Sequence, residues 1–176
     1  MKFARFFVLA LAIIAFTTAA RTRGPGSVEV TLICDFEKAK EAGKYDWVHP
    51  AYGDASDAPS TNCKNGEKVK ITFFNVGQEI VTFQDAEDEI RRHSCRPATW
   101  PELFAVGAQH PDLQRDYHIV AIGSIWKYTA KNPMLKKQVL ILIPSLYWDE
   151  EDGKNLGMDT IVFSGEWHFA AVCGGK

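Results

Sequence analysis

The sequence contains none of the short motifs that mark several common enzyme classes. It has no GxSxG elbow, no P-loop and no glycine-rich dinucleotide fingerprint, which argues against serine hydrolases, nucleotide hydrolases and nucleotide-cofactor enzymes. Its histidines show neither HExxH nor another close spacing that would place two ligands on one metal ion. The histidines are His49, His93, His110, His118 and His168. We therefore expect no metal ion and no cofactor.

A second long hydrophobic segment is also missing. The first such segment, residues 6–16, follows a basic start and is too short to span a bilayer, which takes roughly 20 apolar residues. Thr18 and Ala20 fit the positions before a signal-peptidase cleavage site. The sequence therefore predicts a cleaved secretory signal over residues 1–20. Because the chain also lacks the hydrophobic tail of a lipid-anchor signal, we expect a secreted, extracellular protein without a membrane anchor.

The chain has no excess of basic side chains. Without residues 1–20 it keeps 18 Lys and Arg against 22 Asp and Glu, a formal charge of −4. This balance argues against bulk electrostatic binding to nucleic acid or to an anionic membrane, which takes a basic surface. The remaining length of about 156 residues suits one domain. We expect a flexible lead-in at residues 21–27 and a single, monomeric domain at residues 28–176.

The four cysteines include no CxxC pair, so the usual ligand spacing of a structural zinc site is absent. An even number of cysteines in a secreted chain favours two disulfides, and four cysteines allow three connectivities that the sequence alone does not distinguish. We prefer Cys34–Cys173 with Cys63–Cys95. The first bridge would tie the two ends of the domain, and closing so long a loop removes on the order of 4–5 kcal/mol of unfolded-state entropy.

Strand patterns dominate the domain. Residues 68–75 and 78–83 read as a hairpin around an Asn-Val-Gly turn, and residues 160–163 and 167–172 read as a closing hairpin. Further strand patterns lie at residues 28–36, 116–128 and 138–144. The late strands are consecutive, which predicts an α+β fold with a mainly antiparallel sheet of five or six strands, one or two helices and two disulfides.

Three segments carry helix signals. Thr99 and Glu102 have the spacing of a capping box, which predicts a helix that runs towards Gly107. Residues 85–93 have helix-forming composition with acidic residues at the N-terminal end, where the helix dipole favours them. A short helical turn after residue 36 would end at Gly43.

Acid–base cleavage of a phosphodiester is the enzymatic activity that the side chains allow. A metal-free ribonuclease needs a general base, a general acid and a cation at the phosphate. His118 and His168 lie on predicted strands and would face one concave surface of the sheet, and Glu166 lies two residues from His168. The alternative is that both histidines are ordinary residues at the edge of the core.

The C-terminal segment resembles a hairpin of the small guanyl-specific fungal ribonucleases of the T1 type. The similarity lies in GMDTIVF at residues 157–163 and in FAAV at residues 169–172. The resemblance implies a ribonuclease-like scaffold, with nucleic acid as the ligand. Thr160 stands where the family has its phosphate-facing arginine, and residues 174–176 lack the family's histidine.

The organisation of the chain is similar to that of small secreted effectors of plant-associated fungi. A leader of the MKF…LALA type precedes one compact domain with four cysteines and no catalytic motif. This resemblance implies a virulence-related protein that binds a host target, and it leaves open whether the protein later enters host cells.

Aromatic residues beside turn-rich segments are the candidate binding residues. Exposed aromatic side chains at loop ends suit carbohydrate stacking or a protein hot spot. The loop at residues 48–67 is rich in Pro, Gly, Asp, Ser and Asn and would lie on the surface. The alternative is that the aromatic residues cover the ends of the core. The candidates are Trp47, Tyr52, Tyr147 and Trp148.

These observations favour a secreted, non-enzymatic effector that binds a host protein or another extracellular ligand. One alternative is a T1-like extracellular ribonuclease that uses His118, His168 and Glu166. Another is a secreted inhibitor or carbohydrate-binding protein that uses the loop at residues 48–67.

Overall fold

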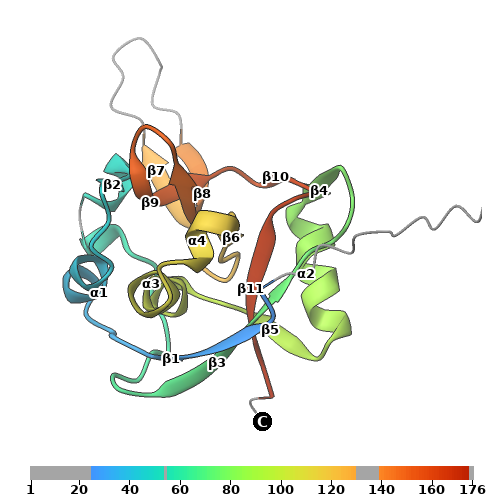
Figure 1. Cartoon of the computed structure of the whole chain (residues 1–176), viewed down its shortest axis with the longest axis horizontal. Helices are drawn as coiled ribbons and strands as arrows, with labels where there is room; N and C mark the ends of the chain where they lie inside the picture. The colour runs from blue at the N-terminus through green and yellow to red at the C-terminus, as the bar shows by residue number, and fades with distance from the viewer. Residues whose placement is uncertain (1–24, 54, 130–138, 175–176) are drawn as a thin grey trace, which may run out of the picture.

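The computed structural model of the chain describes residues 25–53, 55–129 and 139–174 (Figure 1). The predicted signal at residues 1–20 and the start of the predicted lead-in lie outside the described residues. The helices are α1 (Phe36–Ala42), α2 (Phe83–Arg92), α3 (Trp100–Gln109) and α4 (Leu113–Asp116), with 3-10 turns η1 (Pro50–Tyr52) and η2 (Ala55–Asp57). The strands are β1 (Ser27–Thr31), β2 (Trp47–Val48), β3 (Lys68–Phe74), β4 (Ile80–Thr82), β5 (Cys95–Pro97), β6 (Ile119–Val120), β7 (Trp126–Thr129), β8 (Val139–Asp149), β9 (Gly153–Asp159), β10 (Val162–Ser164) and β11 (His168–Cys173).

One large mixed sheet organises the chain. Its strand order is β1-β3-β11-β6-β8-β9-β2, with β5 paired to β11 and β7 paired to β8, and β4 pairs separately with β10. The β11–β6 and β2–β9 pairs are parallel, and the other pairs are antiparallel. The predicted α+β class and the two disulfides are confirmed. The sheet is mixed and has more strands than the five or six expected, and the described residues form four helices rather than one or two.

The two faces of the main sheet are covered by different elements. Helices α1 and α3 pack over the first face, where Ile119 and Leu146 lie in the larger core. Helix α2 and the β4–β10 pair cover part of the second face, over Val120 and Phe169. Figure 1 shows α1 and α3 on one side of β11 and α2 on the other. On the part of the second face that α2 and the β4–β10 pair leave uncovered, β8 and β9 carry half-buried polar and aromatic side chains. These side chains form the candidate site.

The predicted start of α3 and the predicted end of α1 are confirmed. Helix α3 begins with a capping box in which the backbone N–H of Thr99 donates to Glu102 Oε2 at 2.6 Å. The end of α1 is at Gly43, whose N–H donates to the Lys40 and Glu41 carbonyls. Helix α2 follows a further capping box formed by Thr82 with Asp85. These local signals succeed because each one depends on side chains only three or four residues apart.

Both predicted hairpins are wrong, because their arms exchange partners. Strand β4 pairs with β10, and β3 pairs with β11, so neither consecutive pair forms a hairpin. The Asn75 side chain fixes the crossing by donating to the carbonyls of Gly165 and Trp167. A Cβ atom on Gly165 would overlap the Gln78 carbonyl, so a glycine is needed where the two segments of the chain cross. The segment that resembles the T1-type hairpin is therefore not a hairpin in this fold.

The preferred disulfide connectivity is also wrong. The bridges are Cys34–Cys63 and Cys95–Cys173. Cys173 lies directly opposite Cys95 in the β11–β5 pair, with Cα atoms 4.3 Å apart. Strand register therefore decides the pairing, whereas the prediction relied on the entropy of loop closure.

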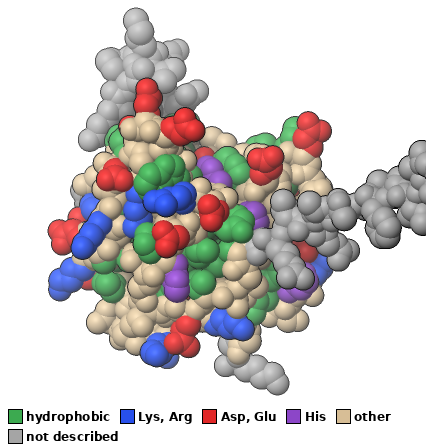
Figure 2. All heavy atoms as spheres, in the orientation of Figure 1, with side chains coloured by type: hydrophobic (Ala, Val, Ile, Leu, Met, Phe, Trp, Pro, Cys, Tyr) green, Lys and Arg blue, Asp and Glu red, His purple; other side chains and the backbone are tan. Residues whose placement is uncertain are grey.

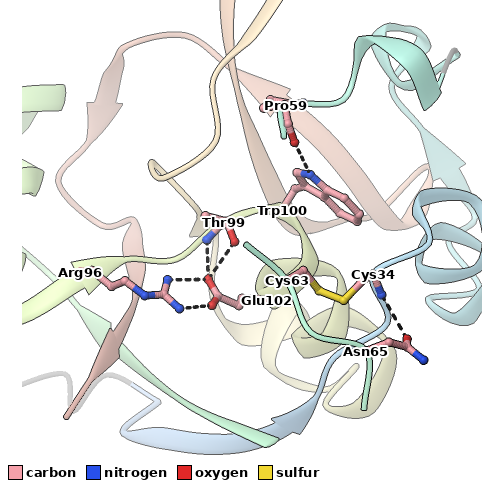
Figure 3. Close-up of a disulfide and its surroundings, with 8 residues drawn as sticks. All are labelled: Cys34, Pro59, Cys63, Asn65, Arg96, Thr99, Trp100 and Glu102. Carbon is pink, nitrogen blue, oxygen red and sulfur yellow. Dashed lines mark hydrogen bonds and ion pairs between the residues drawn. A yellow bond between two sulfur atoms is a disulfide. The ribbon is translucent and has the colours of Figure 1, made fainter. Parts of the chain in front are cut away.

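The segment at residues 48–67 is anchored rather than free. Tyr52 is 1% exposed, and its hydroxyl donates to the Gly157 carbonyl at 2.9 Å. The indole N–H of Trp100 donates to the Pro59 carbonyl at 2.9 Å, and Cys63 is bonded to Cys34 (Figure 3). The prediction that Tyr52 is a binding residue is corrected, because a buried side chain offers no surface to a ligand.

Candidate functional site

The candidate site is built around His118, which lies one residue before β6. Its Nε2 is 2.9 Å from Asp159 Oδ2, and both side chains are about one-fifth exposed. Its ring stacks on that of Trp167, with centroids 3.9 Å apart, and on that of Tyr147, with centroids 5.1 Å apart. A hydrogen-bonded histidine with two stacked neighbours has a fixed orientation.

These side chains belong to one row across the sheet. The row runs over β2, β9 and β8 and continues through the residues just before β6 and β11. Its members are Trp47, Asn155, Tyr147, His118 and Trp167. Neighbouring strands lie about 4.8 Å apart, close to the centroid spacings around His118. The rings around His118 therefore stack along the row and turn their edges, rather than their faces, towards solvent.

Gly157 makes room for the stack. A Cβ atom on Gly157 would lie 2.4 Å from Tyr147 Cε1, so a side chain there would displace the tyrosine. Asp159 follows two residues later on the same strand face. The Gly-x-Asp pattern thus leaves space for the Tyr147 ring at Gly157 and places the Asp159 carboxylate on the same face of β9.

Negative charge gathers around Tyr147. Burial raises the pKa of Tyr147, and the charges of Asp159, Asp149 and Asp152 raise it further. Asp159 also acts on His49, where burial lowers the pKa of the imidazole and the carboxylate opposes that shift. The tyrosine therefore lies within the field of three carboxylates.

Trp148 extends the site to the surface. Its side chain is 41% exposed, and the Arg115 guanidinium of α4 lies over its ring at 4.9 Å. Figure 2 shows acidic side chains among exposed hydrophobic side chains on the face that carries α4, and histidine side chains also reach that surface. Trp148 projects to the opposite side of β8 from Tyr147, because it pairs with Lys154 whereas Tyr147 pairs with Asn155. We name Trp47, Tyr147, Trp148, Asp149, Asp152 and Asp159, which lie on the two sides of the β8–β9 hairpin and at its turn, the acidic–aromatic surface.

The two histidines predicted to act together lie on opposite faces of the sheet. His168 pairs with Ile119 in the β11–β6 register, so it shares the first face with Ile119, whereas His118 projects to the second. His168 is 7% exposed and packs edge-on against Tyr117, and burial lowers its pKa. Glu166 is exposed. The structure therefore does not bring His118, His168 and Glu166 into one acid–base site.

Of the predicted binding residues, Trp47, Tyr147 and Trp148 keep access to solvent. Sequence reasoning did not assign a role to Asp159 or Trp167. The signal for Asp159 was its position two residues after Gly157, which places both on one strand face. Trp167 had no comparable signal, because its place next to His118 depends on which strands are neighbours in the sheet.

Within residues 25–53, 55–129 and 139–174, no group of three His, Cys, Asp or Glu side chains is arranged to hold a metal ion. In the same residues, no helix has the length and apolar character needed to cross a membrane. Comparison with protein-family models, with curated proteins and with solved structures finds no match to this chain.

Proposed function

We propose that the chain is a secreted, non-enzymatic effector-type protein that binds a basic patch on a host protein through the acidic–aromatic surface. The observation that carries this proposal is that the exposed Trp148 lies next to the acidic β8–β9 turn, which is held by hydrogen bonds to Asp149. Two disulfides support an oxidising, extracellular compartment, where such bridges persist.

The acidic part of the surface is pre-organised. Asp149 Oδ1 accepts hydrogen bonds from the backbone N–H groups of Glu151 and Asp152, which fixes the turn between β8 and β9. A fixed turn loses less conformational entropy on binding than a mobile loop. Clustered carboxylates attract a basic partner and raise the rate of association at low salt.

Trp148 is the expected hot spot within this surface. Tryptophan is enriched among the few interface residues that carry most of the binding energy. One face of its ring already meets Arg115, so the side chain is held in place before a partner arrives. The rings around His118 present edges, which favours hydrogen bonding to a protein over stacking on the face of a sugar.

A random peptide display library selected on the immobilised protein tests this proposal. We expect the enriched peptides to carry Lys or Arg, and we expect Trp148→Ala to weaken their binding at least about tenfold, as for a hot-spot residue. The D149N/D152N variant should weaken binding and flatten its salt dependence. The control E87Q/D88N removes the same charge from α2 and should leave binding unchanged. Selection of peptides without basic residues, or binding that Trp148→Ala leaves intact, would contradict the proposal.

A second candidate function rests on the His118–Asp159 hydrogen bond. A carboxylate that orients an imidazole is the arrangement used in general base catalysis, and a metal-free ribonuclease would use it on a 2′-hydroxyl. This candidate predicts cleavage of a single-stranded RNA by the purified protein. Cleavage should fall at least about 100-fold in His118→Ala and in Asp159→Asn, the usual contribution of a general base. Glu166→Gln, an exposed carboxylate outside the pair, is the matched control. Intact RNA after prolonged incubation would exclude this candidate.

A further inference from the structure

A cavity of about 450 Å³ lies away from the acidic–aromatic surface. It is bounded by β3, by the end of β11, by β5 and by the start of α3, and both disulfides contribute to its wall through Cys63 and Cys173. Cavities of roughly 300–1,000 Å³ are the usual size of small-molecule sites. Figure 3 shows Arg96 and Glu102 beside the Cys34–Cys63 bridge.

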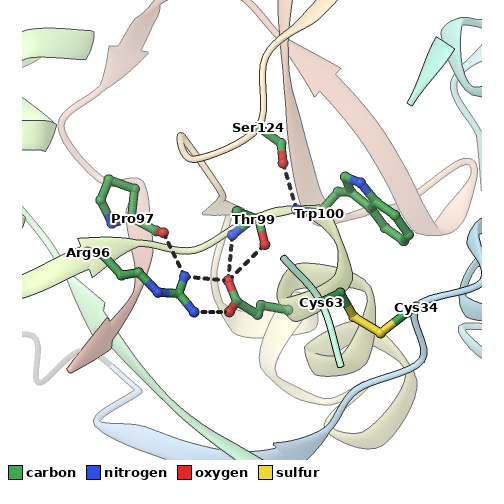
Figure 4. Close-up of polar contacts among 8 residues, drawn as sticks. Cys34, Cys63, Arg96, Pro97, Thr99, Trp100 and Ser124 are labelled. Carbon is green, nitrogen blue, oxygen red and sulfur yellow. Dashed lines mark hydrogen bonds and ion pairs between the residues drawn. A yellow bond between two sulfur atoms is a disulfide. The ribbon is translucent and has the colours of Figure 1, made fainter. Parts of the chain in front are cut away.

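Arg96 is held in this wall by a buried carboxylate. Its two terminal nitrogens donate to Glu102 Oε1 at 2.5 Å and to Oε2 at 3.0 Å, and one of them also donates to the Pro97 carbonyl (Figure 4). Glu102 is 2% exposed and also accepts hydrogen bonds from the backbone and hydroxyl of Thr99. The carboxylate therefore fixes the plane of the guanidinium.

The bonds to Glu102 leave one edge of the guanidinium free. Arginine has five N–H donors in a planar fork, and the Nε–H and one terminal N–H form a second parallel pair. Within the described residues these two donors have no hydrogen-bond partner. A parallel pair of N–H groups matches the two oxygens of a carboxylate.

The polar lining of the cavity is divided between the two faces of the sheet. Arg96 shares a face with Val172 and Val69, whereas Lys68 and Lys70 of β3 project to the opposite face, where Lys70 lies opposite Glu29 in the β1–β3 pair. On the face of Arg96, Glu102 binds the guanidinium and raises its pKa, and the charge of Glu67 raises that pKa further. The ion pair of Lys68 with Glu29 is well exposed on both sides and is therefore weak. The remaining wall is apolar and includes Leu32, Val69, Pro101 and Val172.

We propose that this cavity binds a small organic carboxylate. The carboxylate would lie on the free edge of Arg96, and the apolar wall would hold the hydrocarbon part of the ligand. The site is independent of the acidic–aromatic surface, so either one can fail without the other.

A titration of the full protein, followed by two-dimensional NMR, tests this site with octanoate and benzoate as probes. Their neutral amides and inorganic sulfate are the comparison ligands. We expect the carboxylates to shift the amides of β3, β5 and β11 and to bind at least about tenfold more tightly than the amides or sulfate. Lys70→Gln, which removes a positive charge from the opposite face of β3, and Lys38→Gln, an exposed lysine on α1, are the controls and should leave carboxylate binding unchanged.

Arg96→Lys keeps the charge and removes the parallel donors, so it should weaken carboxylate binding at least about threefold. Equal binding of carboxylate and amide, or of carboxylate and sulfate, would overturn the proposal. No binding at millimolar concentration, or binding that Arg96→Lys leaves unchanged, would overturn it as well.

Discussion

Replacing Cys95 and Cys173 by serine is expected to lower the free energy of unfolding by about 4.5 kcal/mol, the chain-entropy value for a loop of this length. The bridge spans 78 residues of sequence, against 29 for Cys34–Cys63. The same reasoning gives about 3.6 kcal/mol for the shorter bridge. Cys95 also packs against the core beneath α2, so the longer bridge ties that core to the strand that ends at Cys173.

Urea unfolding of the two double-serine variants measures this difference. The C95S/C173S protein should unfold at the lower urea concentration, and the C34S/C63S protein lies between it and the parent. A larger loss on removing Cys34–Cys63 would mean that local strain or residual unfolded structure outweighs the entropy of loop closure.

Replacing Lys154 by methionine is expected to cost about 3 kcal/mol, because a charged donor to two buried carbonyls is removed. The side chain is 9% exposed, and its ammonium donates to the carbonyls of Gly43 and Gly107. These carbonyls belong to the C-terminal ends of α1 and α3, where the helix dipole favours a cation. The ammonium also lies 5.0 Å from the centre of the Tyr45 ring.

Thermal and urea unfolding of Lys154→Met test this role, with Lys38→Met as the matched control. Lys38 is exposed on α1, so its replacement should change the free energy of unfolding by less than about 0.5 kcal/mol. A change of less than 1 kcal/mol for Lys154→Met would show that α1 and α3 hold their positions without the ammonium.

The local signals in the sequence predicted the start of α3 and the end of α1 correctly. The Thr99–Glu102 capping box and the stop at Gly43 each depend on residues within one or two helical turns. The hairpin predictions were wrong because strand pairing depends on contacts between residues that are far apart in the sequence. The exchange of partners between β3–β4 and β10–β11 depends on a contact between Asn75 and Gly165, which are 90 residues apart.

The candidate site was predicted only in part, because some of its residues have local sequence signals and others are brought together by strand order. Trp47, Tyr147 and Trp148 were recognised from their turn-rich surroundings, and they do keep access to solvent. The pairing of His118 with Asp159 joins residues 41 positions apart and follows from strand order. The expectation that His118 and His168 share a face failed because the two lie on adjacent strands whose register places them on opposite sides.

The most direct test of binding through the acidic–aromatic surface is amide NMR mapping of a library-selected basic peptide on the protein. We expect the shifted amides to cluster at the β8–β9 turn and around Trp47, Tyr147 and Trp148, and we expect the shifts to weaken as the salt concentration rises. Shifts confined to β3, β5 and β11, or to the β4–β10 pair, would contradict the claim that the acidic–aromatic surface is the binding site.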